Sequence, residues 1–295
     1  MRVIALLPAA TEIVAALGAA GQLVGISHEC DYPKSILGLP RVTTTTVNVQ
    51  GSGAAIDSEV RSLSASGNPV ISIDAVELQR LSPDLIITQS LCDVCALADG
   101  EVHRLGATLK VAPQILSLDA RDVPGIWSDI QQVGGALDLA DDAEELVLGL
   151  ESRLARLRSR HQSAQPRVVC IEWLDPLYLA GHWVPELVEA AGGQDVGARP
   201  GSHSTRRGWE QLTALEPDHA LVMLCGFGID RALRELQALT DRAALDFLRR
   251  TTVSIIDGNA YTSRPGPRIV DGAIRISSAV SRHPSQDVRR WQPAN

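Results

Sequence analysis

A polar cluster with several potential ligand groups follows the second apolar stretch of the chain. The apolar stretch is Leu23–Ile26, and the cluster after it reads Ser27-His28-Glu29-Cys30-Asp31-Tyr32-Pro33. In a parallel sheet, the residues that follow the strands gather at one edge, and ligands bind there. The expected binding residues of this cluster are His28, Glu29, Cys30, Asp31 and Tyr32.

Two cysteines separated by two residues form the sharpest chemical motif. At the start of a helix, backbone N–H groups would lower the pKa of the Cys92 thiol. Cys92 and Cys95 could ligate a soft metal such as zinc if His28 and Cys30 lie nearby. A single pair of this spacing also occurs where thiols only pack or line a cleft. We expect the second arrangement, so Cys92 is a candidate ligand contact and no metal ligand or covalent cofactor is assigned.

A second set of polar and aromatic residues follows the strands expected in the C-terminal half. The candidate binding residues there are Glu172, Trp173, His182, Trp183, Phe227, Tyr261 and Arg264. The two tryptophans are either core residues or a planar wall for a large ring ligand. His182 is either a ligand contact or a loop histidine bonded to the backbone. The turn Pro265-Gly266-Pro267 would hold Tyr261 and Arg264 in place.

Composition and missing motifs exclude several functions. The 295-residue chain has a formal net charge of −8, which argues against nucleic acid as a partner. No apolar run is long enough to cross a bilayer. We see no G-x-S-x-G elbow, P-loop, H-E-x-x-H motif or dinucleotide fingerprint, so we expect binding without catalysis. Because no basic apolar leader follows Met1, we expect a cytoplasmic protein with reduced thiols.

Strand-like and helical segments alternate along the chain, as in parallel α/β sheets. The expected strands are Val3–Leu7, Leu23–Ser27, Leu85–Gln89, Ile115–Leu118, Val168–Ile171, Leu177–Ala180, Ala220–Leu224 and Val253–Ile256. The expected helices are Glu12–Leu17, Ile56–Leu63, Ala75–Leu81, Asp93–Leu105, Pro185–Ala191, Trp209–Leu215, Asp230–Leu239, Arg242–Leu248 and Arg268–Val280. Thr43–Gly53 is expected to be a loop.

One long amphipathic helix over residues 138–161 divides this pattern. Acidic residues crowd its first turns and arginines its last turns, which complements the helix dipole. We therefore predict two three-layer α/β/α lobes with mainly parallel sheets, joined by this helix. The expected divisions are an N-terminal lobe at 1–120, a helical connection at 121–165, a C-terminal lobe at 166–282 and a polar tail at 283–295 without secondary structure.

Several segments together resemble one known family. They are Pro8-Ala9-Ala10-Thr11-Glu12, Val24-Gly25-Ile26-Ser27 ahead of Asp31-Tyr32-Pro33, Leu81–Ile86, Trp209–Leu212 with Glu216-Pro217-Asp218, and Ser263–Ile269. They resemble the cobalamin- and siderophore-binding proteins of ABC transporters, the class III periplasmic-binding-protein fold. Nearly the whole chain is covered, and the best single match is the cobalamin binder. Ala54–Asp74 differs from that pattern and is read as an insertion.

The resemblance implies a ligand held between two lobes that move little on binding. Cys30, the loop from Ser90, and Asn259–Arg264 match positions that contribute to the cleft in that family. Cobalamin or another corrinoid is the expected ligand, and an imidazole could coordinate its cobalt. A siderophore or haem binder is one alternative. The others are an interaction module and a cytosolic metal-site or thiol redox protein built on Cys92/Cys95 with His28/Cys30. We expect a monomer, with an ABC transporter permease as partner if the protein is exported.

Overall fold

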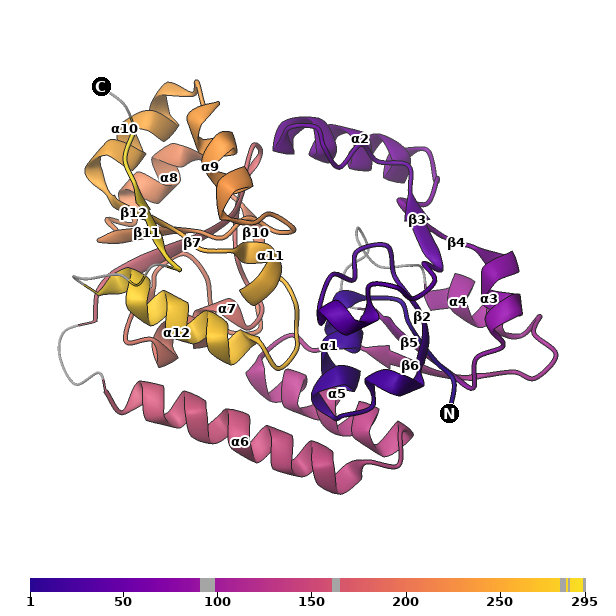
Figure 1. The fold of residues 1–295 in the computed structure, drawn as a ribbon. Helices are drawn as coiled ribbons and strands as arrows, with labels where there is room; N and C mark the ends of the chain where they lie inside the picture. The colour runs from indigo at the N-terminus through magenta and orange to yellow at the C-terminus, as the bar shows by residue number, and fades with distance from the viewer. Residues whose placement is uncertain (91–98, 161–164, 282–284, 286, 294–295) are drawn as a thin grey trace. The chain divides into compact units, whose positions relative to one another are not determined.

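The computed structural model describes residues 1–90, 99–160, 165–281, 285 and 287–293 (Figure 1). The chain divides into two compact units. The first comprises Met1–Gln50, Ser58–Ala120 and Pro124–Gly149, and the second comprises Gly51–Asp57, Arg121–Val123 and Leu150–Asn295. Each unit has its own main sheet.

The main sheet of the first unit is parallel throughout. Its strands are β1 (Val3–Ala5), β2 (Leu23–Ile26), β5 (Leu85–Gln89) and β6 (Gln114–Leu118), in the order β2-β1-β5-β6. The side chains of β1 and the first three residues of β5 are fully buried. Burial on both faces explains why these strands are continuous apolar runs instead of alternating patterns.

Helices and one small two-stranded antiparallel sheet complete the first unit, although residues 53–57 and 123, at the start of two of these helices, are grouped with the second unit. The helices are α1 (Pro8–Ala16), α2 (Gly53–Ala65), α3 (Ala75–Leu81), α4 (Asp99–Gly106) and α5 (Val123–Ala136), with 3-10 turns η1 (Ala20–Gln22) and η2 (Lys34–Ile36). β3 (Thr43–Thr45) pairs antiparallel with β4 (Ile71–Ile73). The Asp74 carboxylate caps α3 by accepting the Glu77 N–H, and Ser82 ends the helix in the left-handed conformation.

The sheet of the second unit is mixed. Its strands are β7 (Arg167–Leu174), β8 (Leu177–Leu179), β9 (Gln194–Asp195), β10 (Thr205–Arg206), β11 (His219–Val222), β12 (Thr252–Ile255) and β13 (Arg289–Trp291). The order is β10-β8-β7-β11-β12-β13, with β9 paired to the start of β7. β7, β11 and β12 are parallel, whereas β8, β10 and β13 pair antiparallel with their neighbours.

Six helices belong to the second unit in the described part of the chain after residue 165. They are α7 (Val184–Ala190), α8 (Trp209–Ala214), α9 (Ile229–Gln237), α10 (Arg242–Arg250), α11 (Gly258–Tyr261) and α12 (Ile269–Val280). Apolar side chains from α8, α9 and α10 bury against β7, β11 and β12 in one core. The polar faces of α9 and α10 remain toward solvent, as expected of amphipathic surface helices.

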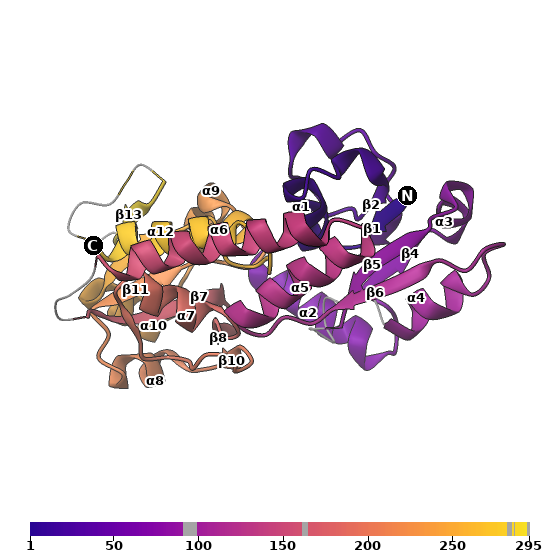
Figure 2. The same ribbon diagram turned by 90° about the horizontal axis from the view of Figure 1, so that it is seen from below.

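The long helix α6 (Ala140–Arg158) is uninterrupted, as Figure 2 shows. Asp141 and Asp142 lie in its first turn, and Arg156 and Arg158 lie in its last turn. The division into units falls after Gly149, so the helix contributes to both. The prediction of a two-lobe α/β fold with one long helix between the lobes in the sequence is confirmed.

Three expectations from the sequence are wrong in detail. The tail expected to lack structure contains β13, where Trp291 pairs with Val253 and packs against the core, because apolar residues recur in that polar segment. The loop expected at Thr43–Gly53 contains β3 and the first residue of α2. The second sheet is less parallel than expected, because the short turn at Asp175-Pro176 folds β8 back antiparallel to β7, and β10 then pairs antiparallel with β8.

One buried carboxylate of the first unit gives a prediction about stability. Asp129 on α5 is 1% exposed and accepts a hydrogen bond from the Ala120 N–H at 3.1 Å. Burial raises the pKa of Asp129 to about 6. Because this folded-state pKa lies above the unfolded value, ionisation lowers the free energy of unfolding as the pH rises from about 4 to 6.

Asp129→Asn removes this titration and keeps an oxygen that can accept the hydrogen bond. We expect its stability relative to the wild type to rise by about 1–3 kcal/mol between pH 4 and pH 8. Urea unfolding at a series of pH values measures the difference, with the exposed Asp142→Asn as control. A difference that does not change with pH would contradict the assignment.

Candidate functional site

In the first unit, Thr43 of β3 holds His28, which lies two residues after the end of β2. The backbone N–H of His28 donates to Thr43 Oγ1 at 2.9 Å, and His28 Nδ1 lies 2.7 Å from the same oxygen. Thr43 Oγ1 also lies 3.1 Å from Ser27 Oγ. Thr43 is buried and His28 is half-buried, so the imidazole is held from the buried side.

The hydroxyl of Thr43 allows two hydrogen-bond patterns with His28. A threonine hydroxyl has one hydrogen to donate and two lone pairs that accept. If its hydrogen is directed at Ser27, its second lone pair accepts from Nδ1–H and Nε2 is unprotonated; if Ser27 donates to Thr43 instead, Thr43 donates to Nδ1 and the proton is on Nε2. The first pattern is the one that would leave Nε2 available to a metal.

Burial favours the neutral form of this imidazole. It lowers the pKa of His28 below its ordinary value, Glu29 opposes this shift, and Arg41 adds to it. A neutral imidazole whose other ring nitrogen donates a hydrogen bond is the usual form of a metal-ligating histidine. With its proton on Nδ1, His28 has the form that donates to a metal through Nε2.

The rest of the cluster differs in exposure. Cys30 is 1% exposed, so its thiol lies in the core. The Arg41 guanidinium donates to the carbonyl oxygens of Ser27 and Cys30 and so fixes the turn between them. Glu29, Asp31 and Tyr32 are exposed and can contact a ligand.

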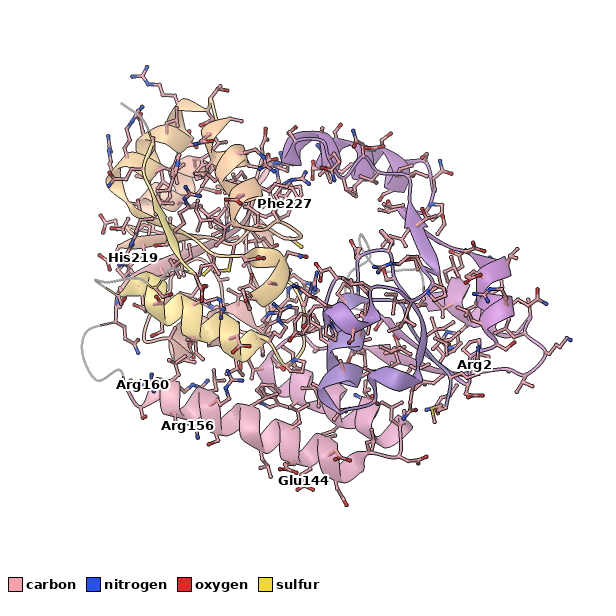
Figure 3. All side chains as sticks on the ribbon, viewed as in Figure 1. Arg2, Glu144, Arg156, Arg160, His219 and Phe227 are labelled. Carbon is pink, nitrogen blue, oxygen red and sulfur yellow. The ribbon has the colours of Figure 1, made fainter. Side chains whose placement is uncertain are left out.

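An aromatic pair in the second unit joins Trp173, within β7, to Phe227, which follows β11. The rings of Trp173 and Phe227 lie 5.2 Å apart at an angle of 47°, and the Arg231 guanidinium lies 3.9 Å from the centre of the Phe227 ring. The position of Phe227 is labelled in Figure 3. Phe227 is buried, whereas Trp173 and the neighbouring Glu172 are only half-buried. Trp173 is thus the member of the pair that can present a face.

His182 and Trp183 have different environments although they are adjacent. Trp183 is 5% exposed and its indole N–H donates to the Thr262 carbonyl at 2.9 Å, so its ring is a core residue. His182 has a left-handed φ of 55° and lies edge-on to His203, with ring centres 5.4 Å apart. Burial, then His203 and Arg121, lowers the pKa of His182 and favours a neutral ring.

Tyr261 and Arg264 are both engaged by neighbouring side chains. The Arg264 guanidinium donates to Asn259 Oδ1 at 2.8 Å, and Arg264 is 6% exposed. The guanidinium groups of Arg268 and Arg275 lie 4.8 and 3.7 Å from the centre of the Tyr261 ring, and Arg275 also donates to its hydroxyl. These contacts hold both residues rigidly.

The cysteine pair of the alternative metal site, Cys92 and Cys95, lies outside the described residues. Of the described cysteines, Cys30 and Cys170 are buried, Cys225 is exposed, and all three are free thiols. Among the described residues, no group of three or more His, Cys, Asp or Glu side chains could hold a metal ion.

Sequence reasoning missed a segment that packs on the second unit far from its neighbours in the chain. We call Gly51–Asp57, which includes the first turn of α2, the clasp. The Gly51 carbonyl accepts from Arg231 at 2.6 Å, and the Gly53 N–H donates to Glu235 Oε2 at 3.0 Å. A Cβ on Gly53 would lie 3.5 Å from the Trp173 ring. No periodicity in the sequence pairs residues some 180 positions apart.

Comparisons with known proteins agree with this fold. A family model described as "Periplasmic binding protein" matches residues 3–257. The uncharacterised ABC transporter substrate-binding lipoprotein YvrC of Bacillus subtilis is 23% identical over 292 residues, 95% of this chain and 79% of the relative.

Two solved structures show the same fold at low identity. A periplasmic haem-binding protein of Pseudomonas aeruginosa has a TM-score of 0.72 at 19% identity, covering 100% of this chain and 99% of that one. The periplasmic vitamin B12-binding protein BtuF of Vibrio cholerae has a TM-score of 0.67 at 21% identity, covering 94% and 95%.

The expectation of a cytoplasmic protein is wrong. The relatives are a lipoprotein and periplasmic proteins, which points to export. The reasoning failed because it relied on the appearance of the first residues alone. In the part of the chain that the structure describes, none of the helices has the length and apolar character needed to cross a bilayer.

The clasp gives a prediction about local stability. A carboxylate at a helix N-terminus stabilises it by about 0.3–1 kcal/mol, and a charged hydrogen bond adds to this. Glu235→Ala should therefore speed amide hydrogen exchange at Gly53 and Ile56 by roughly 3- to 20-fold, with little effect on the melting temperature. Gln237→Ala, an exposed position on the same helix α9, is the matched control. Equal exchange in both variants would show that Glu235 does not hold the clasp.

Proposed function

Because the chain belongs to the periplasmic binding protein family, we propose that it binds a large metal-chelate ligand without transforming it. The ligand class is a corrinoid such as cobalamin, a haem or a ferric siderophore. The structural relatives named for haem and for vitamin B12 support the first two to a similar extent. Corrinoid is the ligand that the sequence resemblance favours.

One observation supports the proposal: Thr43 holds the His28 ring through Nδ1, and with the proton on Nδ1 the other nitrogen, Nε2, is unprotonated. Corrinoids and haems hold a metal in a plane of nitrogens and leave axial positions open to an imidazole. A fully chelated siderophore iron has no such position. His28 therefore favours a planar macrocycle over a siderophore.

The remaining contacts divide by chemistry. In the first unit, Glu29, Asp31 and Tyr32 provide exposed polar groups, and Cys92 remains a candidate. In the second unit, Trp173 offers an aromatic face, while Glu172, His182 and Tyr261 supply polar atoms. Cys30, Trp183, Phe227 and Arg264 are buried, so we assign them to supporting these contacts.

The proposed setting is that of an ABC transporter. We propose that the protein is exported and passes its ligand to a transporter permease, as the description of the lipoprotein relative supports. Substrate-binding proteins of such transporters do no chemistry on the ligand, which is consistent with the missing catalytic motifs.

Visible spectroscopy and calorimetry test the ligand. The protein is titrated with cyanocobalamin, cobinamide and haemin. We expect one of them to bind with a shift of its visible bands. His28→Ala should then weaken binding at least tenfold, which corresponds to about 1.4 kcal/mol. His103→Ala, an exposed histidine on α4, should bind as the wild type does.

Two variants of Thr43 separate positioning from simple loss of structure. Thr43→Ser keeps the hydroxyl and should retain affinity, whereas Thr43→Val removes the acceptor for Nδ1 and should lose several-fold. No band shift and no heat with any of the three ligands at tens of micromolar would rule out the macrocycle. Full binding by His28→Ala would remove the role of His28.

A further inference from the structure

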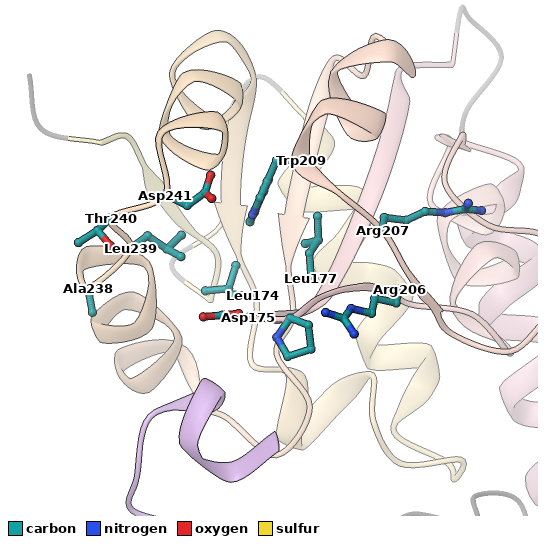
Figure 4. A pocket seen from close by; sticks show the side chains of 11 residues that line it. Leu174, Asp175, Leu177, Arg206, Arg207, Trp209, Ala238, Leu239, Thr240 and Asp241 are labelled. Atoms are coloured by element: carbon teal, nitrogen blue, oxygen red, sulfur yellow. The ribbon is translucent and has the colours of Figure 1, made fainter. Parts of the chain in front are cut away.

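A cavity of about 310 Å³ lies within the second unit (Figure 4). Its walls come from the turn after β7, the residues after β10, the start of α8 and the connection between α9 and α10. None of the residues proposed above for the chelate ligand lines it. A volume near 300 Å³ is at the small end of ligand pockets and far too small for a corrinoid or a haem.

Three apolar side chains form a small apolar floor in a cavity whose lining is otherwise mostly polar. Leu174, Leu177 and Trp209 are all buried members of the core. The Trp209 ring packs against Phe247 with ring centres 5.8 Å apart. An apolar body placed here would contact side chains that already have fixed positions.

The polar groups at the cavity carry both signs of charge. Asp175 and Asp241 provide carboxylates, and Arg206 and Arg207 provide guanidinium groups. In Figure 4 the two carboxylates lie on one side of the view and Arg206 lies on the other, with Leu174 and Leu177 between them. Asp241 is held in place because its Oδ1 accepts the Ala244 N–H at 2.8 Å as the cap of α10.

The arginines and aspartates at the cavity are not paired with one another. Within the described residues, neither Arg206 nor Arg207 forms an ion pair with Asp175 or Asp241. The Arg207 backbone N–H donates to the Leu177 carbonyl, which places the end of β10 at the cavity. In Figure 4 the Arg206 side chain points toward Asp175, whereas the Arg207 side chain points away. Guanidinium groups favour carboxylate ligands, and carboxylates favour ammonium groups.

We infer that this cavity is a second ligand site, which takes a small zwitterion with an apolar body, such as a free α-amino acid with an aliphatic or aromatic side chain. The ligand carboxylate meets Arg206, its ammonium meets Asp175 and Asp241, and its side chain lies on Leu174, Leu177 and Trp209. The lining residues of this site are not among the proposed contacts of the chelate ligand, so we expect the two ligands not to compete directly.

Saturation-transfer NMR and calorimetry on the full chain test this site with L-leucine and L-phenylalanine. Two further probes each lack one charge: 3-phenylpropionate has no ammonium, and phenethylamine has no carboxylate. We expect an amino acid to bind with a Kd below about 1 mM and both single-charge probes to bind at least tenfold more weakly. The chelate ligand should not compete.

Charge-removing variants localise the binding. Arg206→Gln with Arg207→Gln, and separately Asp175→Asn, should each weaken amino-acid binding at least tenfold. Arg250→Gln, an exposed arginine at the end of α10, should leave it unchanged. All these positions are exposed, so the melting temperature should not move.

Three results would overturn the inference. The first is no binding of either amino acid at about 10 mM. The second is binding that the Arg206/Arg207 and Asp175 variants do not change. The third is equal binding of a single-charge probe, which would make the cavity a simple anion or cation site.

Discussion

The hydroxyl of Thr43 makes the interaction on which the proposed ligand site depends. It bonds to the His28 N–H, to His28 Nδ1 and to Ser27 Oγ, so its capacity for hydrogen bonds is used in full. This arrangement fixes the orientation of the imidazole, and in the proposed tautomer it leaves the Nε2 lone pair free. β3 is in position to supply the hydroxyl because it pairs with β4 and because Arg41 bridges to Ile26 at the end of β2. Pairing of two short strands therefore determines the chemistry of a histidine that belongs to neither.

Much of the fold could be predicted because its signals are local. β5 and α3 have the bounds expected from the sequence, since one is a continuous apolar run and the other is capped by Asp74. The alternation of strands and helices places His28 after a strand, as the structure confirms, whereas Trp173, also expected after a strand, lies within β7. Contacts between distant segments could not be predicted. The clasp bonds to Arg231 and Glu235, which lie some 180 residues away in the sequence. β13 forms a strand because it pairs with the edge of β12, and that pairing leaves no signal in the local sequence.

The candidate site was less predictable than the fold, because position after a strand does not determine where a side chain points. Trp183 follows a strand, yet its indole N–H is satisfied by the Thr262 carbonyl inside the core. Arg264 follows another and is bonded to Asn259. The cavity of the second unit could not be predicted from the sequence either. Arg206 and Asp175 belong to no recognisable motif, and only folding brings both to the lining of one cavity.

The tautomer of His28 is the most direct test of the central claim. Long-range ¹⁵N–¹H correlation spectra of the histidine rings report which nitrogen is protonated at each pH, with His28→Gln to assign the signals. The account predicts a neutral ring at pH 7.5 with its proton on Nδ1, a pKa below the ordinary value, and a change at Nε2 when the chelate ligand is added. A proton on Nε2, or a raised pKa, would contradict it.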